Sequence, residues 1–367
     1  MQHCTEIALM KNKEKEASSD SVEGMETEKE REKENRGNGS VFDWARDRYI
    51  LQEKIGEGTF STVYRALDVN TNARVAIKAI TRTTAPGRIL EELQILRRLG
   101  GQSHCIPLLD VLRKHDQILA VFPLINAVEF KEFVTRASGS DVRSYMACLL
   151  TAVAHVHSCG FIHRDVKPSN FVYDMDQGIG FLIDFGLVQK TRVGKPRPAE
   201  PERPVLFFSA TVRPSRPPGY FEGDSRPKMK AARAGTRGFR APEILFRYAN
   251  QGPAIDVWSA GVVLLCILSA QYPFFVSVED VDGLVEMATI FGHAEMRRAA
   301  KQYGRVWKCN IGTVGEDRVD FREILVKMNA DAEIDADALD LLERMLELDN
   351  TKRITAQEAL SHRYFTR

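Results

Sequence analysis

The stretch His163–Asn170 reads HRDVKPSN. Fourteen positions after Asn170, Asp184 begins the triplet Asp184–Gly186, DFG. Asp165 in the first motif is a candidate general base. Asn170 and Asp184 carry the hard oxygen atoms that Mg²⁺ prefers. An isolated Asp in a loop is usually a turn residue or a helix cap, so either motif alone would carry little weight. Together, and in this order, they indicate phosphoryl transfer from ATP.

Further residues fit the same chemistry. Gly56 and Gly58 lie between two predicted strands, and the missing Cβ atoms let the backbone approach a phosphate, although a plain hairpin turn uses the same residue type. We expect Phe60, at the tip of this loop, to shield the phosphates from water. Lys167, two residues after Asp165, would neutralise charge on the transferring phosphate.

Lys78 ends the apolar strand-like run Val75–Lys78. Burying an unpaired ammonium is costly, so a partner is expected. We predict Glu92 on the following helix as this partner, leaving the ammonium to bridge the α- and β-phosphates. The adjacent Glu91 is the alternative, and it would face solvent.

Four charged residues are assigned architectural roles. The triplet Ala241–Glu243 fits the closing helix of an activation segment, and Glu243 is expected to form a buried ion pair with Arg353. Asp256 begins a long apolar helix. It either caps that helix or holds the backbone of His163 and Arg164. A phosphate installed nearby would find a partner in Arg164.

Size and composition fit a globular protein. The 367 residues suffice for one large domain or two lobes, and the formal net charge of +1 implies no global electrostatic partner. Six cysteines form no C-x-x-C pair, which favours reduced thiols in an intracellular protein over a zinc site. The apolar run Val257–Ala270 is too short to span a bilayer, and the polar N-terminus from Lys11 onward has no secretory pattern.

The periodicity predicts strands first and helices later. Predicted strands are Tyr49–Leu51, Thr62–Ala66, Arg74–Lys78, Pro107–Leu112 and Ile118–Phe122, with a helix at Gly87–Leu99. Asp141 is the predicted N-cap of an amphipathic helix. Later helices are predicted at Ala241–Tyr248, Asp256–Leu268, Val278–Phe291 and Ala336–Leu346. A β-rich part followed by an α-rich part is an α+β arrangement.

In this order the motifs resemble those of the eukaryotic protein kinases, from about Tyr49 to Phe365. The resemblance implies a two-lobed fold, with a small β-rich N-lobe at about 43–125 and a larger α-helical C-lobe at about 126–367, after a disordered charged tail over 1–42. It implies ATP and Mg²⁺ as cofactors, and Lys167 favours Ser/Thr over Tyr substrates. The nucleotide-binding residues that it implies are Ile55, Gly56, Gly58, Val63, Ala76, Lys78, Glu92, the gatekeeper Phe122 and the hinge Pro123, Leu124 and Ile125.

Four segments carry a closer resemblance: Ile55–Ser61, His163–Phe171, Ile183–Leu187 and Arg233–Glu243 (RAGTRGFRAPE). They are similar to the cell-division-cycle-seven kinases, which fire replication origins by phosphorylating the MCM helicase. The resemblance implies a Dbf-type zinc-finger regulatory subunit, a nuclear location, and a long activation-segment insert, here about 190–230. Ser61 replaces a third glycine, as in other members of this subfamily, and the insert of the C-lobe is short.

Charge suggests the substrate class. Between Lys190 and Arg240 there are thirteen Lys and Arg residues against four Asp and Glu, although a solvated loop would have the same composition. Arg237 and Arg240 flank the presumed substrate groove beside Thr236. Guanidinium groups there would favour Asp, Glu or phosphoserine just after the target hydroxyl.

Thr236 has two interpretations. It is either an activating phosphorylation site or, with more weight, a residue that hydrogen-bonds the catalytic residues Asp165 and Lys167 and shapes the groove. Other acceptors in the insert have nothing to rank them.

Other classes of function are weighed against this one. Another acidophilic or cyclin-dependent type of kinase is disfavoured by the long insert and the TRGFR run. A pseudokinase scaffold usually loses Lys78, Asp165 or Asp184, all present here. Direct sequence-specific nucleic-acid binding is not expected, because the basic insert has few aromatics and the rest of the chain is neutral. No membrane association is expected.

Overall fold

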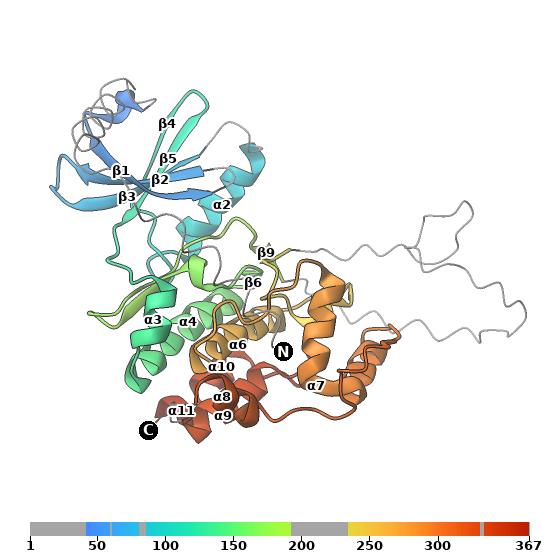
Figure 1. Cartoon of the computed structure of the whole chain (residues 1–367). Helices are drawn as coiled ribbons and strands as arrows, with labels where there is room; N and C mark the ends of the chain where they lie inside the picture. The colour runs from blue at the N-terminus through green and yellow to red at the C-terminus, as the bar shows by residue number, and fades with distance from the viewer. Residues whose placement is uncertain (1–41, 59–60, 81–85, 192–233, 331–333, 367) are drawn as a thin grey trace, which may run out of the picture. The chain divides into compact units, whose positions relative to one another are not determined.

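The computed structural model describes residues 42–58, 61–80, 86–191, 234–330 and 334–366 (Figure 1). The chain divides into two compact units, one of Met1–Gln52 with Ala66–Ala73 and the other of Glu53–Arg65 with Arg74–Arg367. Residues 1–41 of the tail predicted over 1–42, Phe60, and residues 192–230 of the insert predicted over about 190–230 lie outside the described residues.

The described part of the first unit is organised by one carboxylate. Its short 3-10 helix η1 spans Asp43–Ala45 and precedes the start of the first strand. The Asp68 carboxylate accepts a hydrogen bond from the backbone N–H of Asn70 at 2.9 Å and lies 3.8 Å from Arg48 Nε. The backbone N–H of Val69 donates to the Arg48 carbonyl at 2.9 Å. Asp68 thus fixes the turn that follows the second strand.

The first sheet has five strands, hydrogen-bonded in the order β1-β2-β3-β5-β4. Their bounds are β1 Tyr49–Gly58, β2 Ser61–Asp68, β3 Arg74–Ile80, β4 Asp110–Lys114 and β5 Gln117–Pro123. β1 is longer than predicted and runs through Gly58. The predicted bounds Pro107–Leu112 were wrong for β4, which begins three residues later and ends two residues later, because pairing with β5 begins only at Asp110.

Strand β3 presents Lys78 on one face. Alternate residues of Val75–Ala79 are buried, as the period of two in a strand requires. Lys78 therefore shares the opposite face with Ala76, which lies across from Phe122 of β5. Helix α2, Pro86–Leu99, follows β3 and buries Ile89, Leu96 and Leu99.

Two small antiparallel sheets frame the two motifs. In one, β6 (Phe161–Ile162) pairs with β9 (Gln189–Lys190); in the other, β7 (Phe171–Asp174) pairs with β8 (Ile179–Leu182). The HRDVKPSN segment lies between β6 and β7, and the DFG triplet lies between β8 and β9. Paired strands therefore hold both ends of each motif.

The remainder of the described chain is mainly helical. The helices are α3 Phe130–Arg136, α4 Gly139–Ser158, α5 Pro242–Leu245, α6 Ala254–Leu268, α7 Asp280–Gln302, α8 Phe321–Met328, α9 Ala336–Met345, α10 Ala356–Leu360 and α11 Arg363–Thr366, with a 3-10 turn η2 at Pro168–Asn170. In Figure 1 the strands of the first sheet are drawn in blue to cyan and the helices from α3 onward in green to red. The fold class is α+β, as predicted.

The prediction of Asp141 as a helix cap was wrong by three residues. Helix α4 has Ser138 as its N-cap. The Asp141 backbone N–H donates to Ser138 Oγ at 3.3 Å, and the Ser138 backbone N–H donates to Asp141 Oδ2 at 2.8 Å. In this capping box Asp141 is the third helical residue, a position at which a carboxylate is also typical. The helix therefore begins one turn earlier than predicted.

Helices α6 and α7 differ from their predicted forms for physical reasons. Helix α6 begins at Ala254, two residues before the predicted start at Asp256. It is buried almost throughout, which explains why its apolar residues lie on all of its faces. Helix α7 extends to Gln302, but Gly292 inside it has φ of 69°. A Cβ at Gly292 would lie 2.5 Å from the Asp317 carbonyl carbon, so only glycine fits there. The predicted end at Phe291 marks this break.

Within the described residues, no helix combines the length and the apolar character that crossing a membrane requires. Cys105, Cys148, Cys159, Cys266 and Cys309 are free thiols. Helix α5 is shorter than its predicted range because it ends at Leu245, where the chain turns.

Candidate active site

The backbone that precedes Asp165 is fixed by a single buried carboxylate. Asp256 on α6 accepts hydrogen bonds from the backbone N–H groups of His163 and Arg164, both at 2.7 Å. His157 Nε2 on α4 lies 2.8 Å from the same carboxylate. Arg164 has φ of 71°, which is strained for a residue with a side chain, and these hydrogen bonds stabilise it there. Of the two predicted roles of Asp256, the structure has the second.

Asp165 lies at the centre of a closed network of hydrogen bonds. Its Oδ1 accepts from the Thr236 backbone N–H at 2.8 Å and from Thr236 Oγ1 at 2.7 Å. Its Oδ2 accepts from Lys167 Nζ and Asn170 Nδ2, both at 2.9 Å. Lys167 also donates to Thr236 Oγ1 at 2.6 Å. The predicted contacts of Thr236 with both catalytic candidates are therefore present.

This network keeps Asp165 ionised. Burial acts to raise the pKa of Asp165, but hydrogen bonds from Thr236 and Lys167 outweigh it and lower the pKa below the usual 3.8. A carboxyl with a lowered pKa stabilises the fold above its unfolded pKa, and this contribution is lost as pH falls through the folded pKa. Burial also lowers the pKa of His163, whose neutral ring packs edge-on against Phe185 at 5.4 Å.

Thr236→Val is expected to raise the pKa of Asp165, because the substitution removes the hydrogen bond that the Thr236 hydroxyl donates to the ionised carboxylate. The pKa is measured by carboxyl-carbon NMR titration of the purified protein. Thr236→Ser keeps the hydroxyl and serves as the control. An unchanged pKa in the Val variant would show that the backbone N–H and Lys167 suffice.

Lys78 has the expected partner. Its Nζ donates to Glu92 Oε1 at 2.7 Å and lies 3.8 Å from Asp184 Oδ1. Burial acts to lower the pKa of Lys78, but the charges of Glu92 and Asp184 outweigh it and raise the pKa above 10.5. The ammonium therefore stays charged at neutral pH. Glu91, the alternative partner, is exposed to solvent, and Lys78 pairs with Glu92 instead.

Asn170 and Asp184, the predicted magnesium ligands, carry oxygen atoms of the kind that Mg²⁺ binds. The amide nitrogen of Asn170 is used by Asp165, to which it donates at both the backbone oxygen and Oδ2, so the amide oxygen is left as a ligand. Asp184 has a side chain that is 45% exposed, and its Oδ1 accepts from the Gly186 backbone N–H at 3.1 Å. One carboxylate and one amide oxygen are a usual protein contribution to Mg²⁺, which keeps further ligands from water and phosphate.

The remaining nucleotide-binding candidates lie on four strands and on the segment that follows β5. Ile55, Gly56 and Gly58 are in the last part of β1, Val63 is in β2, and a Cβ at Gly56 would lie 3.6 Å from that of Val63. Ala76 of β3 pairs with the gatekeeper candidate Phe122 of β5. The hinge candidates are Pro123, which ends β5, and Leu124 and Ile125, which follow it.

The two arginine candidates for substrate recognition differ in environment. Arg240 donates through Nε to the Gly235 carbonyl at 2.9 Å and through Nη1 to Asp280 Oδ1 at 2.7 Å. Arg237 is exposed, and within the described ranges it has no hydrogen-bond or ion-pair partner. Gly235 has φ of 98°, and a Cβ there would lie 2.7 Å from the Arg164 carbonyl oxygen. Glycine therefore lets the segment before Thr236 approach the catalytic loop.

The predicted buried ion pair between Glu243 and Arg353 is also present. Arg353 donates Nη1 and Nη2 to the two carboxylate oxygens of Glu243, at 2.8 and 3.0 Å, and both side chains are fully buried. Arg164 uses Nη1 on Gln189 Oε1 at 2.8 Å. Its guanidinium is therefore engaged beside β9.

Sequence reasoning missed Asp280, Arg247 and His157. Asp280 accepts from Arg240 and, at 3.4 Å, from Arg247 Nη2. An acidic residue at the start of a helix is ordinary, so Asp280 carried no signal of a further role. His157 lies at the end of α4 and contacts Asp256 across 99 residues of sequence, a pairing that no local pattern indicates.

With this geometry established, comparisons with known proteins identify the class. The chain belongs to the protein kinase family, whose domain description matches residues 49–365. A probable cell division control protein 7 homolog 1 from Encephalitozoon cuniculi is 53% identical over 322 residues, covering 87% of this chain and 92% of that protein. The cell cycle serine/threonine-protein kinase hsk1 of Schizosaccharomyces pombe is 38% identical, covering 86% of this chain and 72% of that protein.

A human cell division cycle 7-related protein kinase is 27% identical, covering 73% of this chain and 69% of that protein. These relatives place the chain in the cell-division-cycle-seven subfamily and make it a serine/threonine kinase. Protein kinases in general use ATP and Mg²⁺. The predicted family, subfamily and enzyme class are confirmed.

Proposed function

We propose that this kinase transfers the ATP γ-phosphate to a Ser or Thr hydroxyl through the residues assembled around Asp165. Asp165 accepts the proton of, or orients, the attacking hydroxyl, and Lys167 neutralises charge on the phosphoryl group. Lys78, held by Glu92, positions the α- and β-phosphates. Magnesium on Asn170 and Asp184 would neutralise phosphate charge. The observation that carries this proposal is the Asp165 network, in which Thr236, Lys167 and Asn170 all donate to one carboxylate.

The proposed substrates are acidic-context sites on the MCM helicase, phosphorylated to initiate DNA replication in the nucleus. Support comes from the names of the relatives, which describe cell-division and cell-cycle kinases. Charge supports it too, because Arg237 is exposed next to Thr236. A cation beside the reacting hydroxyl stabilises a substrate that carries an acidic group at the following position.

Arg237→Glu is expected to lower the preference for acidic peptides by about tenfold, because the substitution changes the local charge by two units close to the bound substrate. The preference is the ratio of kcat/KM for two peptides that differ only in Asp or Asn after the target Ser. Arg298→Glu is the control, since Arg298 is an exposed residue on α7. An unchanged ratio in Arg237→Glu would remove Arg237 from substrate recognition.

We propose a Dbf-type zinc-finger regulatory subunit as the activating partner. The subfamily membership supports this proposal. The test is affinity purification of the tagged full-length chain from its own cells, followed by mass spectrometry and a kinase assay of the eluate. Recovery of a zinc-bearing subunit together with MCM proteins is the expected result, whereas recovery of a cyclin would overturn the assignment of partner.

A further inference from the structure

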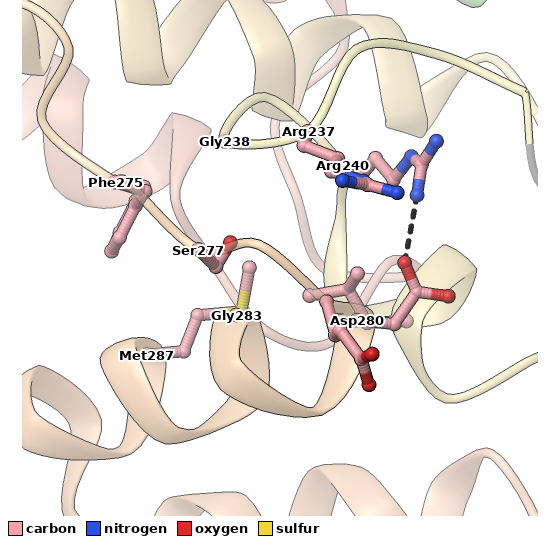
Figure 2. Close-up of a pocket in the computed structure, with 10 residues that line it drawn as sticks. Arg237, Gly238, Arg240, Phe275, Ser277, Asp280, Gly283 and Met287 are labelled. Carbon is pink, nitrogen blue, oxygen red and sulfur yellow. Dashed lines mark hydrogen bonds and ion pairs between the residues drawn. The ribbon is translucent and has the colours of Figure 1, made fainter.

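Three charged side chains, here called the Asp280 cluster, meet beside the pocket that is lined by Arg237, the candidate for substrate recognition. The cluster consists of Arg240, Arg247 and Asp280, and Figure 2 shows the Arg240–Asp280 ion pair at the side of a small pocket. Asp280 Oδ1 accepts from Arg240 Nη1 at 2.7 Å, and its Oδ2 accepts from Arg247 Nη2 at 3.4 Å. The side chains of Arg240 and Asp280 are 15% and 10% exposed. Water therefore screens these charges less than it screens charges on the open surface.

The cluster lies next to the catalytic residues. Arg240 lines this pocket and also the one that contains Asp165 and Thr236. A guanidinium has five N–H donors, and Arg240 uses Nε on Gly235 and Nη1 on Asp280. Among the residues that the structure describes, Nη2 of Arg240 has no hydrogen-bond partner. An acidic group on a substrate at this place would meet the three side chains of the Asp280 cluster, which among the described residues carry two positive charges and one negative charge and sum to +1.

Asp280 is not needed to begin its helix. The N-cap of α7 is Glu279, which forms a capping box with Asp282. The Glu279 backbone N–H donates to Asp282 Oδ2 at 3.0 Å. The carboxylate of Asp280 is thus turned to the two arginines, and capping does not explain its presence.

We propose that Asp280 sets the strength of the preference for acidic substrates, by neutralising one of the two guanidinium charges that attract them. The proposal rests on the acidic-substrate preference proposed above. The recognised group is a carboxylate on the substrate peptide just after the target hydroxyl. It is attracted by the net charge of the cluster and repelled by Asp280 itself, so Asp280 limits the discrimination between acidic and neutral peptides.

The test is a cycle of four proteins that differ in the charge of the cluster. Wild type carries +1, Asp280→Asn carries +2, Arg247→Gln carries 0, and the double variant again carries +1. The measured quantity is the ratio of kcat/KM for the Asp peptide to that for the Asn peptide, with the full chain and its co-purifying subunit. We expect the ratio to rise about three- to tenfold in Asp280→Asn, to fall by a similar factor in Arg247→Gln, and to return near wild type in the double variant.

The change is expected in KM for the acidic peptide, because the cluster acts on binding and does not touch the reacting atoms. Glu323→Gln, which removes an exposed carboxylate on α8, is the control for a general effect of charge. Melting temperatures show whether each variant is folded. If Asp280→Asn does not fold, the rise from Arg247→Gln to the double variant is the test.

The outcomes are distinct. A ratio that is unchanged or lower in the folded Asp280→Asn variant overturns the inference and leaves Asp280 as a support for the arginines. Failure of both Asp280 variants to fold also overturns it, because Asp280 would then serve stability. A wild-type ratio near one instead overturns the proposed preference for acidic substrates, whatever the variants do.

Discussion

Asp165→Asn is expected to lower kcat by about 10²- to 10⁴-fold, the range that general-base or orienting groups contribute. The amide can still accept a hydrogen bond from Thr236 at one oxygen, so the loop geometry is kept. The amide cannot accept a proton. Its nitrogen also cannot accept the hydrogen bonds that Lys167 and Asn170 donate to Oδ2 of Asp165 in the wild-type protein. The measurement is steady-state phosphorylation of a Ser peptide together with the dissociation constant for Mg²⁺-ATP.

Nucleotide affinity is expected to change by less than about threefold, because the Asp165 side chain bonds to Thr236, Lys167 and Asn170, and Lys78 bonds to Glu92. Asp176→Asn is the matched control, since Asp176 is an exposed Asp between β7 and β8. A kcat within a factor of ten of wild type in the Asp165 variant would contradict the proposed role of this residue.

Arg353→Ala is expected to destabilise the fold by about 3–5 kcal/mol, because it leaves the buried carboxylate of Glu243 without its counter-charge. Arg353 also donates Nη1 to the Ala254 carbonyl and Nε to the Glu347 carbonyl, both at 2.8 Å, and lies over the Trp258 ring at 5.1 Å. Its removal therefore loosens α5 and α6 together. Urea unfolding, monitored by fluorescence, gives the free energy of unfolding.

Lys327→Ala is the control for this prediction. It breaks the pair with Glu323 on α8, in which the side chains are 70% and 56% exposed. An exposed pair contributes about 1 kcal/mol or less. Equal losses of unfolding free energy in Arg353→Ala and Lys327→Ala would mean that the buried ion pair stabilises the fold no more than the exposed one. Glu243→Gln, which keeps the shape and one acceptor, is expected to lose less than Arg353→Ala.

The candidate catalytic groups could be proposed from the sequence because each is marked locally. Asp165 and Asn170 belong to one continuous motif, and Asp184 to another. The Lys78–Glu92 pair could be predicted because an ammonium on an apolar strand demands a partner, and a helix with a carboxylate follows. The boundaries of β3 and α2 followed from period and length, and the structure differs from them by a few residues at most.

The rest depends on contacts between distant segments. The true start of α4 at Ser138 was missed because Ser and Asp three residues apart both satisfy cap preferences, and only the hydrogen bonds decide between them. Helix α7 resumes after the non-helical Gly292, whose backbone lies close to Asp317, and no local pattern predicts this. The pairing of Asp280 with Arg240 joins residues 40 positions apart, and no periodic pattern records it.

The Asp256 carboxylate has a consequence for how the enzyme is made. During translation, residues 163–165 are synthesised well before residue 256. Until Asp256 is added, the backbone N–H groups of His163 and Arg164 lack the carboxylate that accepts their hydrogen bonds. The strained φ of Arg164 has nothing to hold it during that interval. A nascent or prematurely terminated chain that contains every catalytic side chain is therefore expected to be inert, and phosphotransfer begins only once α6 has been synthesised and has docked.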